Sequence, residues 1–283
     1  RGDLTITGGS DILRYALVAS YYGERGIFVT DESKSWDSGT RLNKYNVRSN
    51  VDINVTKTTL VSVSIGGYLQ EQNGVVQNVQ DIWNYAFDTP PFVHPTQYAN
   101  GDNVRVQSRQ NPWAEVTQHG YKTTSNSKVE SLFSIEQDLK FITPGLKIKG
   151  LFSFDRYSSS WIKRSRTPTY YNPASGRDPE TGDLILAVGT DGQEFLSTES
   201  SGEWGNKATY LEGNITYDRT FGKHAVNGML LYNQRDYNDG SVVPYRRMGL
   251  AGRASYTFDN KYIAEFNFGY NGSENFARGN RFG

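Results

Sequence analysis

Cysteine is absent from this chain of 283 residues, which excludes disulfide bonds, thiol catalysis and thiolate metal sites. An excess of one charge is also lacking. The 30 basic residues balance the 30 acidic ones, so there is no electrostatic reason to expect nucleic acid as a partner. No apolar run approaches the ~18 residues that a membrane-spanning helix needs. Membrane strands are not excluded in this way, because each strand of a β-barrel is only half apolar.

Tyrosine and glycine are abundant instead, with 19 and 29 residues, while methionine occurs only twice. Tyrosine favours β-strands and glycine favours turns, so this composition is typical of an all-β chain with many turns. The chain begins at Arg1 without a segment like a signal peptide, and a strand-like run starts at Asp3. We therefore expect an internal segment of a longer protein, in which residues 1–283 form part of one domain.

Alternation of apolar and polar residues with a period of two predicts antiparallel strands along the whole chain. The tenth of these, near 262–272, carries aromatic residues on one parity and Glu265, Asn267 and Asn271 on the other. The aromatic residues are Tyr262, Phe266, Phe268 and Tyr270. The predicted strands span 3–8, 13–23, 42–55, 60–71, 127–140, 146–158, 207–220, 225–237, 247–258 and 262–272.

The connections between these strands are short at one end of the predicted sheet and long at the other. Odd-to-even connections are tight turns such as 142–145 and 259–261, whereas even-to-odd connections include 24–41, 72–126 and 159–206. Short turns opposite long loops are typical of an outer-membrane barrel. We therefore predict an antiparallel up-and-down transmembrane β-barrel, of which this chain supplies about ten strands.

In such a barrel the aromatic parity of each strand faces lipid and the polar parity faces the lumen. Tyr262, Phe266, Phe268 and Tyr270 are therefore predicted to face lipid. The five tryptophans lie in or at the ends of the long connections, and Trp161 and Trp204 are expected in an interfacial girdle on the loop side.

The long connection 72–126 holds the best candidates for ligand binding, and residues 81–87 within it are predicted to form a short helix. Trp83, Tyr85, Trp113 and Tyr121 accompany several glutamines and asparagines. Aromatic faces beside amide groups suit sugar rings or peptide side chains. The favoured alternative is that these aromatic residues pack the loop on itself or against a partner.

Catalytic chemistry finds no support in the sequence, and no catalytic residue is proposed. His94, His119 and His224 are far apart, so they are interpreted as polar surface residues rather than catalytic bases. The acidic segment 178–183 is rich in oxygen ligands and is a weak candidate for loop-bound calcium, but it lacks the spacing of an EF-hand. A plain turn is favoured there, and no other cofactor or metal is expected.

Five runs of the chain resemble the barrel strands of SusC/RagA-type TonB-dependent transporters. They are 14–28, 44–59, 210–224, 228–237 and 245–283. The resemblance implies a bacterial outer-membrane nutrient importer whose plug, TonB box and remaining strands are absent from this chain. It also implies coupling to the TonB complex through the missing plug, outer-membrane lipid around the barrel, a SusD-like surface lipoprotein as a lid, and a glycan or oligopeptide as cargo.

Two other classes of protein remain open at this point. A soluble β-sandwich that binds carbohydrate with its long loops predicts a soluble monomer without detergent. A self-contained ten-stranded barrel enzyme requires acidic and histidine residues clustered at the loop rim, and the three histidines are poorly placed for that.

Overall fold

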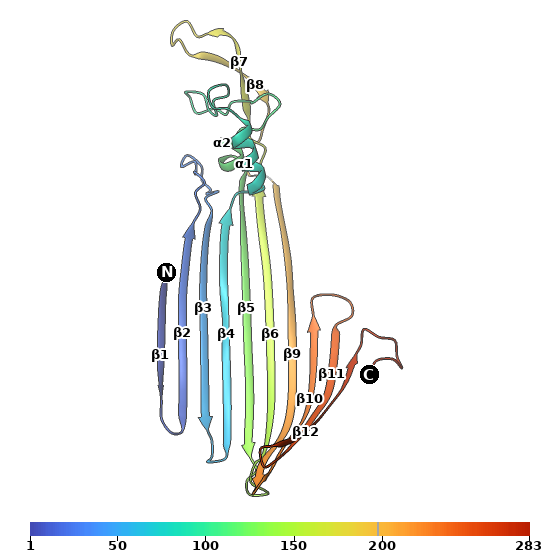
Figure 1. The fold of residues 1–283 in the computed structure, drawn as a ribbon. Helices are drawn as coiled ribbons and strands as arrows, with labels where there is room; N and C mark the ends of the chain where they lie inside the picture. Colours follow the sequence, from blue (N-terminus) through green and yellow to red (C-terminus); the bar gives the residue numbers. More distant parts are fainter. Residues whose placement is uncertain (197) are drawn as a thin grey trace.

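The computed structural model describes residues 1–196 and 198–283, and it contains one long, open antiparallel sheet with a loop assembly at one end (Figure 1). The ten strands of this sheet follow the order β1-β2-β3-β4-β5-β6-β9-β10-β11-β12. Their bounds are β1 Gly2–Gly9, β2 Leu13–Arg25, β3 Arg41–Asn54, β4 Thr59–Gly74, β5 Gly120–Asp138, β6 Leu146–Ser165, β9 Thr198–Phe221, β10 His224–Asn238, β11 Tyr245–Phe258 and β12 Tyr262–Ser273. The predicted up-and-down arrangement of ten strands is confirmed, and the sheet is not closed within this chain.

Three neighbouring strands, β5, β6 and β9, extend further toward the loop end than the sequence predicts. Their ends remain in register, because Gly120 pairs with Ser165 and Ser165 pairs with Thr198. The added segments are rich in serine, threonine and glycine, so they carry no apolar alternation. The prediction that Trp161 and Trp204 lie in or at the ends of the long connections is therefore wrong, since both lie within strands.

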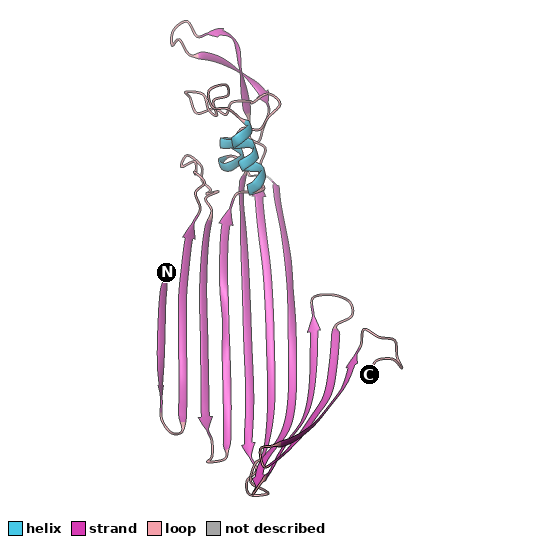
Figure 2. Ribbon diagram, viewed as in Figure 1, coloured by secondary structure: helices cyan, strands magenta, loops and turns pink. Residues whose placement is uncertain are grey.

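The connections at the loop end contain more structure than the sequence predicts (Figure 2). Helix α1 (Val79–Asp88) confirms the helix predicted at 81–87, and its first turn is capped by the Asn78 side chain. Helix α2 (Pro112–Thr117) and the hairpin of β7 (Tyr170–Arg177) with β8 (Leu184–Thr190) were not predicted. None of the described helices is long and apolar enough to cross a membrane.

Strand register aligns the apolar parities of the sheet into one continuous surface, which we call the apolar face. A single row across the sheet follows successive pairings and consists of Tyr15, Val51, Val63, Phe133, Phe152 and Leu211. The opposite surface, the polar face, carries charged pairs. Arg48 lies 3.1 Å from Glu130, which also contacts Lys128, and Arg253 lies 2.8 Å from Glu265.

The buried apolar residues of the molecule lie outside the ten-stranded sheet. Among the described residues, the buried apolar ones are Val75, Ile82, Val104, Val106, Ala114 and Val116. All six belong to the connection between β4 and β5. This connection, together with 26–40 and 166–196, forms the loop assembly. The sheet itself is a single layer that buries no apolar side chain among the described residues.

Candidate functional site at the loop end

A polar network joins the three connections of the loop assembly. The Gln118 side chain donates to the Asp31 carboxylate at 2.7 Å, and the Arg166 guanidinium donates to the backbone oxygen of Gln118 at 2.9 Å. Arg166 also donates to the carbonyl oxygens of Gln193 and Glu194. Burial lowers the pKa of the Arg166 guanidinium. The network fixes the geometry at the loop end, because each connection contributes a hydrogen-bond donor or acceptor.

Asp31 is ionised within this network. Burial opposes ionisation, but hydrogen bonds from Ser33 and Gln118 and the charge of Lys34 outweigh it and lower the pKa of the carboxyl group. The Lys34 ammonium lies 3.8 Å from the Asp31 carboxylate. Asp31 therefore acts as a fixed negative charge that holds the 26–40 connection against α2.

Helix α2 is positioned by a buried asparagine that precedes it. The Asn111 side-chain oxygen accepts hydrogen bonds from the backbone N–H groups of Trp113 and Ala114, as an N-cap does. Its side-chain nitrogen donates to the carbonyl oxygens of Thr96 and Val104. One side chain therefore satisfies both the helix end and the loop that crosses it.

A chain of polar contacts runs from α2 to β7. Glu115, which is buried, lies 3.2 Å from Nε2 of His119, and the same nitrogen lies 3.3 Å from the Tyr170 hydroxyl. Burial raises the pKa of Tyr170, and the charge of Glu115 raises it further, so this phenol stays protonated. The interpretation of His119 as a surface residue is wrong, because it is half-buried between two partners that other elements supply.

A cavity of about 850 Å³ opens beside this region, between α1, the 105–111 segment and β7. Its lining is mostly polar and includes Tyr85, Arg105, Arg109, Asn172 and Tyr170. Arg105 lies between two buried valines and donates to the Gly189 carbonyl oxygen at 2.7 Å. Guanidinium, amide and hydroxyl groups converge here, so the cavity can bind a polar solute by hydrogen bonds.

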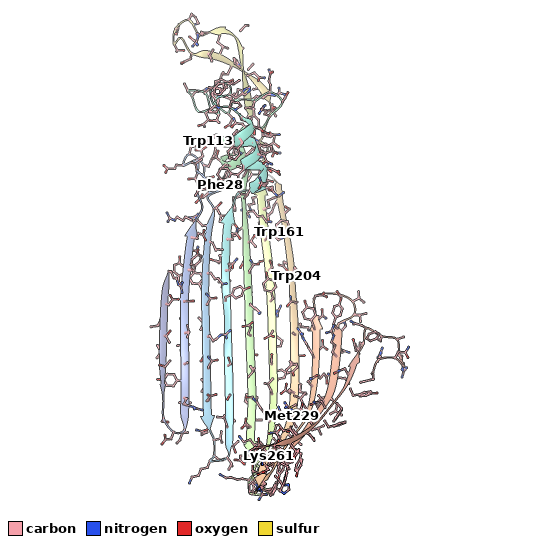
Figure 3. The ribbon with its side chains drawn as sticks, viewed as in Figure 1. Phe28, Trp113, Trp161, Trp204, Met229 and Lys261 are labelled. Atoms are coloured by element: carbon pink, nitrogen blue, oxygen red, sulfur yellow. The ribbon has the colours of Figure 1, made fainter. Side chains whose placement is uncertain are left out.

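The sequence-predicted ligand residues are not gathered in one place. Tyr85 lines the cavity, whereas Trp83 packs between Phe28 and Phe87, with ring centroids 5.9 and 6.2 Å away. Figure 3 places Phe28 and Trp113 at the loop end.

Trp113 lies in α2, and its indole N–H is buried without an acceptor among the described residues. Tyr121 lies in β5, and its parity places it on the apolar face with Phe133. Packing is the favoured role for Trp83 and Trp113. Ligand binding by any of the four aromatic residues stays a prediction.

The four residues predicted to face lipid lie on the apolar face. In β12, Phe266 pairs with Ala254, Phe268 with Gly252, and Tyr270 with Leu250 of β11. Tyr262 is 71% exposed, but Ile263 on the opposite parity is 73% exposed, because a strand at the edge of a single layer is open on both sides. Register, not exposure, therefore assigns these side chains to the apolar face, and contact with lipid stays a prediction.

The acidic segment 178–183 forms the turn of the β7–β8 hairpin. The Asp178 carboxylate accepts hydrogen bonds from the backbone N–H groups of Glu180 and Thr181, and these lower its pKa. The described residues include no group of three histidine or acidic side chains arranged to hold a metal ion. The geometry is that of a plain turn.

Arg105 and Arg109 were not singled out from the sequence, although they contribute two cations to the largest of the cavities described. Arg109 is exposed and makes no side-chain hydrogen bond or ion pair with the described part of the chain. A spacing of four residues between arginines in an irregular loop carries no periodic signal. Ser108, whose φ is 58°, turns the backbone between the two arginines, and both side chains line the same cavity.

Comparisons with known proteins agree with this architecture, although no family model matches the chain. TonB-dependent receptor P3 of Formosa agariphila is 22% identical over 319 residues, which cover 99% of this chain and 28% of that protein. The RagAB peptide transporter matches with a TM-score of 0.67 at 13% identity, and the RagAB peptide importer in its closed-closed state with 0.68 at 14%. Each match covers 99% of this chain and 32% of the solved chain.

The chain is similar in sequence to a TonB-dependent receptor over almost its whole length, and its sheet has the fold of part of a transporter barrel. More narrowly, the segment has the fold of the corresponding part of a RagA-like barrel. The chain spans about a third of the length of the proteins it matches. The expected resemblance to TonB-dependent transporters and the expected partial barrel fold agree with these findings.

Proposed function

We propose that this chain forms part of the wall and outer loops of a TonB-dependent importer that takes up oligopeptides or glycans with a SusD-like surface lipoprotein. The observation that carries the proposal is the single-layer sheet. One of its faces is continuously apolar, and none of its apolar side chains is buried by the described residues. Such a sheet gains stability from lipid on the apolar face and from water or a plug on the polar face.

The free edges of the sheet support its place in a larger barrel. Among the described residues, β1 pairs only with β2, and β12 pairs only with β11 between Tyr262 and Tyr270. Unpaired backbone groups are not tolerated in hydrocarbon, so further strands must continue the sheet from both edges. We call this whole protein the complete receptor, and we propose that its other parts include the plug that couples to the TonB complex.

Oligopeptides are the favoured cargo, because the matched RagAB structures are those of a peptide transporter. The polar cavity at the loop end supports the same choice, since guanidinium and amide groups suit peptide carbonyl and carboxylate oxygens. Glycans remain the alternative cargo, because the same amides and Tyr85 also suit sugar hydroxyls and rings.

Exposed aromatic residues at the loop end support a protein partner. Phe87 and Phe92 are 83% and 88% exposed, and both lie in the loop assembly, away from the apolar face. Contiguous exposed apolar patches mark contacts with other proteins, and these two aromatic side chains are our candidates for such a patch. We assign them to the surface lipoprotein.

Uptake tests the transport proposal. Cells that carry the complete receptor should accumulate labelled oligopeptides or oligosaccharides, and cells without it, or without TonB, should not. Equal accumulation in all three strains would rule out import.

Co-purification tests the partner. Replacing both Phe87 and Phe92 by aspartate should release the lipoprotein from the purified complex. The matched control is Phe141→Asp, because Phe141 is 74% exposed at the opposite, turn end of the sheet. Retention of the lipoprotein by the double variant would contradict the assignment.

A further inference from the structure

Strand β9 is much longer than its neighbour β10, and part of it has an unpaired edge. It pairs with β6 from Thr198 onward, whereas its pairing with β10 ends at Lys207, opposite Asn238. Figure 1 shows β9 rising well above β10 and β11. Along 198–206, which we call the β9 edge, none of the described residues pairs with β9 on the side away from β6.

The register identifies which backbone groups point to this open side. The Asp218 N–H donates to the Gly145 carbonyl oxygen, just before β6, at 3.0 Å. Even-numbered residues of β9 therefore direct their backbone groups toward β6, because the direction alternates along an antiparallel strand. The pairing with β6 is continuous through the β9 edge. The residues whose N–H and C=O groups point to the open side are consequently Glu199, Ser201, Glu203 and Gly205.

The β9 edge lacks most of the features that protect strand edges from pairing. Natural edge strands carry proline, charged side chains (lysine above all) or a bulge, or they are covered by another element. Glu199 and Glu203 are the charged residues of this stretch. Residues 198–206 contain neither proline nor lysine, and their register with β6 has no irregularity. The connection between β10 and β11 makes no backbone hydrogen bond to them within the described structure. This edge is therefore open to an added strand.

A hollow whose lining contains two aromatic side chains among polar and charged residues lies beside the edge. Its volume is about 510 Å³, and its lining includes Tyr157, Trp204, Gly205, Asn238 and Gly240. Trp204 is 54% exposed and meets Tyr157 edge to face, with ring centroids 5.2 Å apart. Figure 3 shows Trp204 on the upper part of the sheet. By parity Trp204 belongs to the polar face, on the lumen side of the proposed barrel.

We propose that the β9 edge binds an extended oligopeptide as an additional strand, with one peptide side chain seated against Trp204. The inference rests on the proposed import function and specifies how peptide cargo is recognised. Strand addition uses main-chain hydrogen bonds, which every peptide offers irrespective of its sequence. The hollow beside Trp204 adds a preference for side chains that stack on an aromatic face. This combination suits an importer of many different peptides.

Backbone methylation of the ligand tests the inference on the unaltered protein. The probes are N-acetyl-Thr-Ala-Thr-Ala-Thr-amide and the same peptide with every backbone nitrogen of its five residues methylated, titrated into the complete receptor in detergent. Loss of the peptide N–H donors should weaken binding by about tenfold or more, as expected when at least two hydrogen bonds are lost. Equal affinity for the two probes would overturn strand addition.

A proline variant with a matched control tests the position of the site. Ser201→Pro removes one backbone N–H from the open side. It leaves the hydrogen bonds between β9 and β6 intact, because the backbone N–H and C=O groups of Ser201 point away from β6. It should weaken binding of the unmethylated peptide several-fold, whereas Ser201→Ala should bind it as the unmodified receptor does. Wild-type affinity in Ser201→Pro would exclude the β9 edge.

Hydrogen exchange at single-residue resolution gives a second measurement that does not depend on any variant. Bound peptide should slow exchange at the amides of 199, 201, 203 and 205 more than at 200, 202 and 204, which already face β6. Equal slowing of both sets, or of neither, would contradict the inference. If the receptor imports peptides but shows no alternating protection, the proposed function stands and the β9 edge is excluded as the binding site. If the receptor imports no peptide, the proposal that peptides are its cargo is itself contradicted.

Discussion

The ten-stranded sheet and the loop assembly are stabilised in opposite ways. The sheet has an extensive backbone ladder but buries no apolar side chain among its described residues, so its apolar face depends on surroundings that other molecules supply. The loop assembly contains its own small core around Val75, Ile82 and Val116, and its own polar network. In the proposed barrel, the apolar side chains of the sheet therefore face outward, whereas those of the loop assembly are buried inside it.

The largest expected effect comes from placing a charge on the apolar face. Phe266→Arg should cost roughly 2–4 kcal/mol in the complete receptor if this position lies near the middle of the bilayer. Folding into lipid vesicles, followed in a urea titration, measures the loss. Asn267→Arg is the matched control, because it lies next in sequence on the polar face. Equal losses for both variants would contradict the assignment of the apolar face to lipid.

Damage to the loop core should have a different signature. Ile82 is 2% exposed, so Ile82→Ala leaves a cavity and should destabilise the loop assembly by about 2–3 kcal/mol. Hydrogen exchange in α1 and α2 should accelerate, while the yield of receptor assembled in the membrane should stay unchanged. Val79→Ala is the control, because Val79 begins the same helix and is 50% exposed. Loss of membrane assembly in Ile82→Ala would show that the two regions are not independent.

Removal of the α2 cap should have a smaller effect confined to one part of the loops. Asn111→Ala loses an N-cap and two buried donors, so it should cost about 1–2 kcal/mol of local stability. Faster exchange at the amides of Trp113 and Ala114 measures this loss. Asn111→Asp is the informative comparison, because it keeps the cap acceptor and removes the donors to Thr96 and Val104. Exchange in Asn111→Ala as slow as in the unmodified chain would rule out the capping role.

Acidification should have the smallest of these effects on the stability of the loop assembly. The pKa of Asp31 is lowered from its ordinary value of 3.8, so its contribution to stability is complete above that value. The contribution is lost as the pH falls through the folded-state pKa, which lies below 3.8. Loop amide protection, corrected for intrinsic exchange, should be constant from pH 7 to 5 and should fall below pH 4. Asp31→Asn should lack this step, and a step at higher pH would point to another group.

The sequence predicted the part of the fold that has a strong period of two. All ten strands of the sheet were located, and the unequal connections indicated which end carries the loops. The extensions of β5, β6 and β9 were missed because serine and glycine have the same backbone donor and acceptor as valine but leave no apolar pattern. The β7–β8 hairpin was missed because its strands are short and its first strand contains Pro173.

The candidate site was less predictable than the fold, because it is formed by tertiary contacts between irregular segments. Tyr85 was selected for its chemistry and does line the largest cavity described. Arg109 reaches the same cavity through a single left-handed residue, and Arg166 reaches Gln118 from a connection far away in sequence. The unpaired length of β9 is the difference between where β9 begins and where its pairing with β10 ends. Errors of a few residues in either predicted boundary conceal it.

A core confined to the loops has an evolutionary consequence. In the proposed receptor, substitutions in the loop assembly would alter recognition without touching the apolar face on which membrane insertion would depend, so the two properties would change separately. A whole connection, such as the one that carries α1 and α2, can in principle be exchanged between related barrels as a cassette. The specificity of the proposed importer would then change by replacement of one connection, while the strands of the wall would be inherited almost unchanged.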